Sequence, residues 1–567
     1  MAKYTRLGDL LVGTGVITSE ELNKALELQK ITKERLGTTL INSGIISEFE
    51  LIGALQQQLG IDYVDLSKIT IPTELAQLIP KSLAKQYQIV PVKLDKEKLY
   101  IAMADPMNFY AVEEVRKTSH KQVVQMIASS SAVDYAITIL YGNEGAAKAI
   151  EDMRKEVSNS EVNTVELTSA FQTNNLDDDI NSAPTIRLVN SIIERAVNER
   201  ASDIHLEPKE KEFVCRMRID GVMRQILTVP KELQNSVISR IKIMSSLDIS
   251  ERRVPQDGRF NVRIKDKDID LRISTLPTVY GEKVVARLLD KSQSRLSKEM
   301  IGLRGRDLEK YNQMVHCHNG VILITGPTGS GKSSTMYTMI NELNTESVNL
   351  VTLEDPVEYN VDGVNQVQIN EKTGMTFASG LRSILRQDPD IIAVGEIRDG
   401  ETAEIAMRSA ITGHVVLSTI HTTDSIGTIE RLIDIGVEPY LISSALKGVV
   451  AQRLVRKICP NCRKEYVPSL EELQSLSTVP SSDTKFYKGE GCSECYNTGY
   501  KGRIGVFEML PITKDIRSLI TKRASHDQYE DVLRNTDFKT LRQSAENLVR
   551  EGITTVEEVC RVINEEI

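Results

Sequence analysis

One eight-residue segment constrains the fold of this chain more than any other. Gly326-Pro327-Thr328-Gly329-Ser330-Gly331-Lys332-Ser333 follows the apolar run Val321–Ile324 and precedes a predicted helix that begins at Ser334. In such a loop the glycines let backbone N–H groups turn inward around phosphate oxygens, and the helix N-terminus adds its dipole. Lys332 can reach the β- and γ-phosphates, and the Ser333 hydroxyl can ligate Mg²⁺. The segment therefore predicts a nucleotide site; the alternative is a plain glycine-rich turn before a helix.

Further short apolar runs indicate the kind of sheet that carries this loop. Val348–Leu353, Ile391–Val394 and Val415–Ile420 are separated by helical segments. Such runs are typical of parallel strands buried on both faces. We therefore predict an α/β domain with a parallel-type sheet.

Acidic residues follow two of these predicted strands. Glu354, Asp355 and Glu358 come after the first, and Gly395-Glu396 comes after the second. The carboxyl ends of parallel strands meet in one crevice, so these side chains should surround the nucleotide, hold Mg²⁺ and orient the attacking water. For Glu354 alone, a helix cap or a solvated loop residue is the alternative. His421 ends a fourth strand and could sense the γ-phosphate, or be a hydrogen-bonded core histidine.

Two pairs of cysteines predict a metal site. Cys459 and Cys462 form one C-x-x-C turn, and Cys492 and Cys495 form another after 29 intervening residues. Four thiolates on two tight turns suit a tetrahedral, structural Zn²⁺ site. The alternative is two redox pairs or free thiols. The remaining cysteines are isolated in the sequence and are interpreted as core or surface thiols: Cys215, Cys317 and Cys560.

Taken together, these motifs resemble the ATPase superfamily of type II secretion and type IV pili. The resemblance spans roughly residues 183–567 and rests on the phosphate loop and five further segments: Glu354–Glu358, Gly395-Glu396, Gly413–His421, Ala201–Pro208 and Arg216–Gly221. It implies a RecA-like P-loop ATPase domain preceded by a small α+β, PAS-like domain, and a hexameric ring with ATP between the two domains. The four cysteines resemble the assembly and secretion branch rather than the retraction ATPases.

The resemblance also implies residue roles. Glu358 would be the general base, and Glu396 the carboxylate of the Mg²⁺ site. An arginine supplied in trans can stabilise the charge on the transferred phosphoryl group. Arg272 and Arg287 match the arginine-finger segment, and Arg259 is a third candidate, for which a surface ion pair is the alternative.

The N-terminus contains an internal repeat. Arg6-Leu7-Gly8 recurs as Arg35-Leu36-Gly37, and the same offset of 29 relates Gln29 to Gln58. Each copy is predicted to form a short and a longer helix, with Ser19 and Ser47 as N-caps. The pair resembles the cyclic di-GMP-binding module found on some members of the superfamily, in which Arg6 and Arg35 would contact guanine or phosphate and Gln29 and Gln58 base edges. The alternative is a helical module that binds only protein.

These observations divide the chain into five parts. The duplicated helical module is assigned to residues 1–62, and an α+β subdomain with predicted strands Ile89–Val92 and Leu99–Met103 to residues 63–142. Residues 143–182 have the polar composition of a flexible acidic linker. The remaining two parts are the arginine-bearing domain, residues 183–295, and the ATPase domain with a zinc lobe (459–495) and a helical C-terminus, residues 296–567.

The net charge and the lengths of the apolar runs limit the classes of function open to this chain. The formal net charge is −9 and no apolar run reaches the ~20 residues of a membrane span, so we expect a cytoplasmic protein that reaches the inner membrane through partners and binds no nucleic-acid polymer. Our leading hypothesis is a homohexameric ATPase, requiring ATP and Mg²⁺, that drives pilus extension through a membrane platform protein. The alternatives are a type II secretion ATPase, a non-catalytic nucleotide or cyclic di-GMP scaffold and a DNA translocase, the last disfavoured by the acidic charge.

Overall fold

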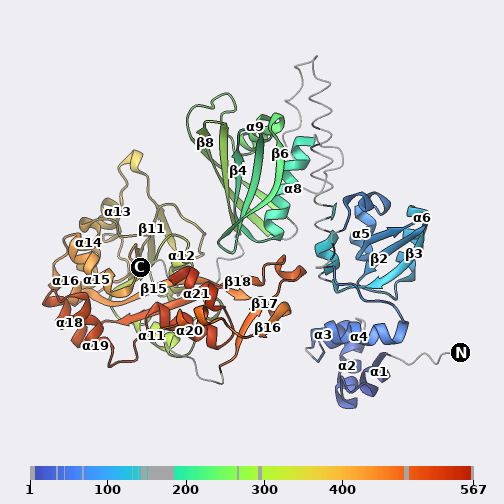
Figure 1. The fold of residues 1–567 in the computed structure, drawn as a ribbon. Coiled ribbons are helices and arrows are strands. Elements are labelled where there is room, and N and C mark those ends of the chain that lie inside the picture. Colours follow the sequence, from blue (N-terminus) through green and yellow to red (C-terminus); the bar gives the residue numbers. More distant parts are fainter. Residues whose placement is uncertain are drawn as a thin grey trace.

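The computed structural model describes most of the chain (Figure 1). The described residues are 7–32, 36–43, 45–46, 48–66, 69, 71–130, 132–137, 140–141, 150, 153, 184–264, 267–290, 297–477 and 484–563. Most of the predicted linker 143–182 lies outside them; its described residues Ile150 and Met153 pack against the core of the following domain. No helix in the described ranges is long and apolar enough to cross a membrane.

The N-terminal repeat folds as two interlocked helical pairs. α1 packs on α4, and α2 on α3. The core consists of equivalent positions of the two copies, such as Leu11 with Leu40 and Ala25 with Ala54. The helices are α1 (Leu7–Gly13), α2 (Ser19–Thr32), α3 (Leu36–Asn42) and α4 (Glu48–Leu59).

The predicted N-cap of α2 was wrong by one residue. Ser19 is the first helical residue, and the preceding Thr18 caps the helix. The Thr18 hydroxyl accepts from the backbone N–H of Glu21 at 3.3 Å, while the Glu21 carboxylate accepts from the Thr18 N–H at 2.8 Å. This reciprocal pair satisfies two N–H groups that the helix leaves free. Ser47 lies outside the described residues.

A small α+β subdomain follows. Its three-stranded sheet has the order β1-β2-β3, with β1 and β2 antiparallel and β2 and β3 parallel. Both predicted strands are confirmed. The elements are η1 (Thr73–Leu78), α5 (Lys81–Tyr87), β1 (Ile89–Asp95), β2 (Lys98–Met103), α6 (Phe109–Ser119) and β3 (Gln122–Ile127), followed by helical residues between 130 and 141.

The next domain is a six-stranded antiparallel sheet of order β6-β5-β4-β9-β8-β7. α8 and α9 cover one face and share its core with alternate strand residues such as Leu271 and Ile273. Since successive strand residues point to opposite faces, Arg272 between them must point to the other face. The elements are α8 (Pro184–Asn198), β4 (Ala201–Pro208), β5 (Glu212–Ile219), β6 (Val222–Pro230), η3 (Lys231–Leu233), α9 (Gln234–Met244), β7 (Gln256–Ile264), β8 (Lys267–Thr278) and β9 (Gly281–Asp290).

The largest domain contains a seven-stranded sheet of order β12-β11-β13-β14-β10-β15-β18. The predicted parallel arrangement is confirmed for its first six strands, and β18 is an antiparallel edge strand. Alternate residues of β10 face opposite layers: Ile322 and Ile324 pack with α11 and α12, while Val321 and Leu323 pack in the second layer.

The elements of this domain up to its central strands are α10 (Lys298–Ile301), α11 (Gly305–Val315), β10 (Gly320–Thr325), α12 (Lys332–Leu343), β11 (Leu350–Glu354), β12 (Asn365–Gln368), η5 (Glu371–Thr373), α13 (Phe377–Ile384), β13 (Ile391–Val394), α14 (Gly400–Ile411), β14 (Val415–Ile420), α15 (Ser425–Asp434) and α16 (Pro439–Ala445). The C-terminal elements are β15 (Leu446–Ile458), η6 (Pro460–Cys462), β16 (Arg463–Tyr466), α17 (Leu470–Gln474), β17 (Phe486–Gly489), η7 (Ser493–Cys495), β18 (Tyr500–Pro511), α18 (Lys514–Thr521), α19 (His526–Leu533), α20 (Leu541–Arg550) and α21 (Val556–Ile563).

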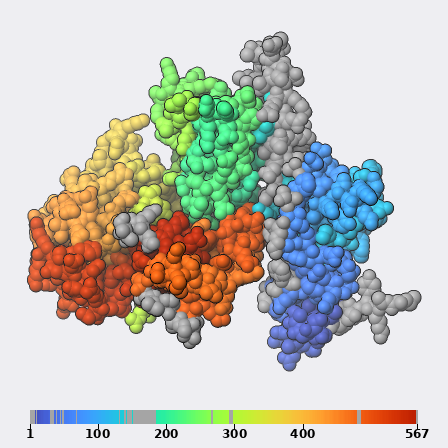
Figure 2. All heavy atoms as spheres, in the orientation of Figure 1, coloured from blue at the N-terminus to red at the C-terminus, as the bar shows by residue number. Residues whose placement is uncertain are grey.

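The antiparallel domain lies between the largest domain and the N-terminal parts of the chain (Figure 1). Figure 2 shows a hollow between this domain, in green, and the yellow part of the largest domain. A cleft of about 850 Å³ is lined by residues from both, among them Arg259, Arg272 and Arg287 of the antiparallel domain and Pro356 and Val357 of the largest domain.

Candidate nucleotide site and candidate metal centre

The phosphate loop joins β10 to α12. At Gly331, which caps α12, φ is +90°, a conformation that favours glycine. A Cβ on Gly326 would lie 2.4 Å from the carbonyl oxygen of Gln452, so a side chain there would collide with β15. Pro327, Thr328 and Gly329 at the tip are exposed. The backbone thus has the turn and the access that a phosphate cradle needs.

Polar groups inside the loop suit an anionic ligand. Lys332 donates from Nζ to the carbonyl oxygens of Gly326, at 2.6 Å, and Pro327, at 3.1 Å. Burial lowers the pKa of Lys332 to about 8, against the opposing effect of the Glu396 charge. The Ser330 hydroxyl is buried and has no hydrogen-bond partner among the described residues. A buried hydroxyl without a partner is costly, and a phosphate oxygen would satisfy it. Ser333 is exposed and Ser334 half-buried at the start of α12.

Glu396 lies at the centre of a charged cluster beyond β13. His421 Nε2 lies 3.1 Å from its Oε2. Arg398 donates from Nε to its Oε1 at 2.8 Å and also from Nη2, which lies 3.7 Å from Asp355. The structure therefore brings together the carboxylate and the histidine that the sequence singled out. A carboxylate at this strand end is a suitable oxygen ligand for Mg²⁺.

Glu354 differs from the sequence expectation of a nucleotide or Mg²⁺ contact. Its side chain is buried in the interior, where Tyr337 donates to Oε2 at 2.5 Å and Thr352 to Oε1 at 2.6 Å. Gln366 donates to Oε1 at 3.1 Å. Because neighbours already bind both oxygens, the structure gives Glu354 a supporting position instead.

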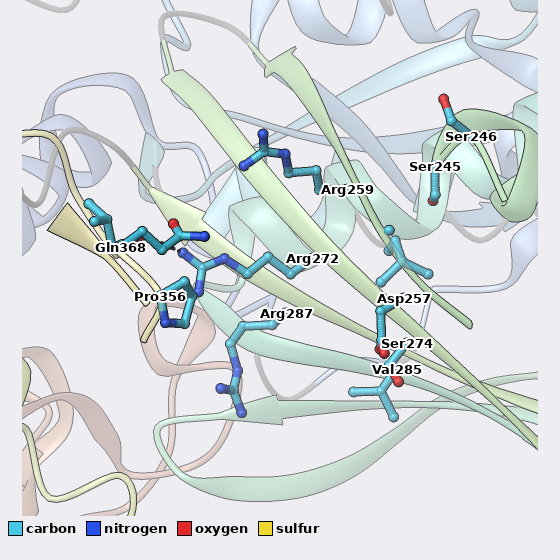
Figure 3. Close-up of a pocket in the computed structure, with 13 residues that line it drawn as sticks. Ser245, Ser246, Asp257, Arg259, Arg272, Ser274, Val285, Arg287, Pro356 and Gln368 are labelled. Carbon is cyan, nitrogen blue, oxygen red and sulfur yellow. Dashed lines mark hydrogen bonds between the residues drawn. The ribbon is translucent and has the colours of Figure 1, made fainter. Parts of the chain in front are cut away.

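Three arginines form a row across neighbouring strands. Arg259 on β7 is directly opposite Arg272 on β8, which is directly opposite Arg287 on β9. Like charges placed opposite one another destabilise a sheet, so such a row needs compensation by anions. Figure 3 shows the three side chains on the same side of the sheet, with Arg272 extending toward Pro356 and Gln368 of the other domain.

Arg272 bridges the two domains. Its Nη1 lies 2.6 Å from Oε2 of Glu358, and its Nη2 donates to the carbonyl oxygen of Val357 at 3.0 Å. Arg287 instead pairs with Asp203 on β4, at 3.1 Å, and Arg259 is exposed in the cleft. The structure thus places an arginine of the antiparallel domain against the carboxylate predicted to be the general base, within one chain.

The four cysteines converge on one point. The Sγ atoms lie within 4.8 Å of one another: Cys459 and Cys492 are 3.7 Å apart, Cys462 and Cys495 3.8 Å, and Cys492 and Cys495 3.7 Å. Around a tetrahedral Zn²⁺ with bonds of about 2.3 Å, sulfur atoms would be ~3.8 Å apart. Without a metal, burial raises the pKa of Cys462 to about 12. The donor set and its spacing therefore fit a closed, four-sulfur zinc site.

Comparisons with known proteins agree with this geometry. A family profile described as "Type II/IV secretion system protein" matches residues 178–561. The chain is 40% identical over 561 residues to a type IV pilus assembly ATPase of Myxococcus xanthus, covering 98% of each chain. This chain belongs to the type II/IV secretion system protein family.

Two further comparisons extend this result. The chain is 40% identical over 501 residues to type II secretion system protein E of Pseudomonas aeruginosa, covering 88% of this chain and 99% of that one. Among solved structures, the ATPase DotB of Yersinia pseudotuberculosis matches 67% of this chain and 93% of its own with a TM-score of 0.51. At 22% identity this likeness shows the fold alone.

The N-terminal repeat is described only in part. A profile described as "MshEN domain" matches residues 59–147, which is the α+β subdomain rather than the repeat. Arg6 and Arg35 lie outside the described residues. Gln29 and Gln58 are half-buried on α2 and α4. Their contact with a nucleotide stays a prediction.

Two polar side chains near the candidate site, those of Arg398 and Tyr337, were not predicted from the sequence. Arg398 could have been found, because it lies two residues beyond Glu396 at the same strand end. Tyr337 gave no signal, since it lies among the apolar residues of α12 and only the fold shows its hydroxyl between Glu354 and the segment that carries Glu358.

Proposed function

We propose that this chain hydrolyses ATP to power the assembly of a type IV pilus. The observation that carries the proposal is the meeting of Arg272 with Glu358 across the cleft between the two domains. A phosphoryl-transfer site needs a phosphate cradle, a carboxylate for the water and a cation for the developing charge. This chain has candidates for all three.

Each residue has a distinct proposed role. The loop Gly326–Ser333 and Lys332 bind the phosphates, and Ser333 with Glu396 would hold Mg²⁺, which neutralises charge on the phosphate oxygens when bound. Glu358 orients the attacking water and accepts its proton. Arg272 and Arg287 stabilise the transferred phosphoryl group, and Arg259 lies on the same face to bind nucleotide. His421 touches Glu396, so it can respond when the γ-phosphate leaves.

The oligomeric state and the partner proteins are proposed separately. We infer a homohexamer whose domain pairs close on ATP and open after hydrolysis, acting from the cytoplasmic side on an inner-membrane platform protein. A ring of alternating closed and open interfaces passes such motion to a bound partner.

The proposal is tested by complementing a deletion strain with wild type or Glu396→Ala and imaging surface pili. Pili restored only by wild type, with phosphate release lost in the purified variant and nucleotide binding retained, support the proposal. Pili that form without the gene refute the pilus role. Unchanged phosphate release from Glu396→Ala or Glu358→Ala refutes the role assigned to that residue.

A second candidate function is the export of folded proteins by type II secretion. It is favoured by the relative from Pseudomonas aeruginosa, which has the same 40% identity. A deletion strain that makes normal pili but keeps its exported proteins inside the cell would support this alternative.

The N-terminal repeat is proposed to bind cyclic di-GMP through Arg6, Arg35, Gln29 and Gln58. The support is the matched pair of motifs and the symmetric core in which the two copies pack. Isothermal titration of the full chain with cyclic di-GMP should give saturable heat. No heat above background at high micromolar ligand would leave a module that binds only protein.

A further inference from the structure

We propose that Tyr337 is a positioning residue that fixes the Glu358 segment relative to the phosphate loop. The inference rests on the proposed hydrolysis of ATP. It assigns Glu354 the task of holding Tyr337, instead of contacting nucleotide.

The Tyr337 hydroxyl makes contacts in two directions. It donates to Oε2 of Glu354 at 2.5 Å, and it accepts from the backbone N–H groups of Glu358 and Tyr359, both at 3.3 Å. A phenol has one proton to donate and lone pairs to accept with. With its proton directed at a carboxylate, the hydroxyl presents only acceptor sites to the Glu358 segment.

Glu354 is itself held in place. Thr352 and Gln366 donate to its other oxygen, and Gln366 Nε2 also donates to the carbonyl oxygen of Tyr359 at 2.9 Å. Tyr337 and Glu354 are each 3% exposed. Burial and the bond to Glu354 raise the pKa of Tyr337 well above its usual range, so the hydroxyl keeps its proton. The network therefore has a single arrangement of donors and acceptors.

The network connects two parts of the nucleotide site. Tyr337 lies on α12, five positions after Lys332. Glu358 lies beyond β11, and its carboxylate pairs with Arg272 while its backbone N–H donates to Tyr337. Tyr337 thereby sets the placement of the candidate base relative to the helix whose N-terminus binds phosphate. Placement errors of about 1 Å can reduce turnover by roughly a hundredfold.

The test compares Tyr337→Phe with Tyr311→Phe. Tyr311 is a matched control because it is also fully buried, lies in the same domain and donates to a glutamate, Glu342 on α12, at 3.0 Å. Phosphate release gives kcat and KM, and a fluorescent ATP analogue gives the dissociation constant.

We expect Tyr337→Phe to lower kcat by roughly 10- to 100-fold, with KM and the dissociation constant within threefold of wild type. Tyr311→Phe should leave kcat within threefold. Thr352→Val removes one donor to Glu354 and keeps the side-chain shape, so it should also lower kcat, by a smaller factor than Tyr337→Phe. If Tyr337→Phe fails to fold, Thr352→Val tests whether the network positions Glu358.

The inference is overturned if Tyr337→Phe matches Tyr311→Phe in kcat, or if binding weakens in proportion to turnover, which would indicate a purely structural role. A wild-type chain that binds nucleotide and releases no phosphate would overturn the proposed function itself, and the inference with it.

Discussion

Removal of the metal from the cysteine cluster should unfold the zinc lobe while the phosphate loop stays folded. Among its described residues (459–477 and 484–495), the lobe contains one two-stranded sheet, β16–β17, and one large buried apolar side chain, that of Phe486. A two-stranded sheet is marginal alone, and burying one phenylalanine contributes about 2–3 kcal/mol. Structural zinc contributes about 10–16 kcal/mol in small zinc-binding peptides. A zinc ion bound at the four cysteines would therefore be the largest stabilising term in the lobe.

Hydrogen exchange measured by mass spectrometry tests this reasoning. Cys462→Ser should bind no zinc by elemental analysis and lose amide protection over the lobe, whereas peptides covering Gly326–Ser333 keep theirs. Exchange should also rise at Gly499, just beyond the cluster, because its N–H donates to the sulfur of Cys495 at 3.3 Å. Cys317→Ser is the control: its thiol lies outside the cluster and one zinc per chain should remain. A metal-free lobe that stays protected would refute the reasoning.

Three more predictions concern the candidate nucleotide site. The pKa of Lys332 is lowered to about 8, and phosphate binds the protonated amine better than the neutral one. Nucleotide affinity should therefore be constant below pH 8 and weaken by up to ~10-fold per pH unit above it. Binding titrations from pH 7 to 9.5 measure this dependence, and an affinity that stays constant over the whole range contradicts it. Arg272→Ala should lower kcat about 10³-fold, and Arg272→Lys nearly as much, since an ammonium cannot contact two phosphoryl oxygens with the paired donors of a guanidinium; phosphate-release assays test both variants, and a kcat near that of wild type would contradict the prediction. Arg398→Ala should strengthen Mg²⁺ binding severalfold, seen by Mn²⁺ electron paramagnetic resonance, because it frees an oxygen of Glu396; weaker binding would oppose this.

Local patterns made the ATPase-type domain predictable. The phosphate loop, the four cysteines and the strands were recognisable because each is defined by residues close in sequence. The cysteine cluster was also predictable because only two C-x-x-C turns had to come together, and the spacing within each turn already limits how four thiols can be arranged.

Properties set by long-range pairing were not predictable from local patterns. The sequence offered Arg259, Arg272 and Arg287 as separate candidates, and strand register alone puts them in one row. Glu354 was expected at the nucleotide because it ends a strand. Its direction depends on Tyr337 and Gln366, which come from other elements and provide the donors that draw it inward.

The contacts between the antiparallel domain and the ATPase-type domain differ at their two ends, and this difference bears on the motion. Beside the zinc lobe, two separate links join the domains: the Gly502 N–H donates to Asp220, and the Asn198 carbonyl oxygen accepts from Tyr496. At the cleft, the links come from Arg272, which donates to the Val357 carbonyl oxygen and pairs with Glu358; the two paired side chains are 27% and 29% exposed. Partly exposed ion pairs contribute about 0–1 kcal/mol, so a bound nucleotide can displace Arg272 from Glu358 at little cost. We therefore expect the domain to pivot about its zinc-lobe end while the arginine row moves onto and off the phosphates.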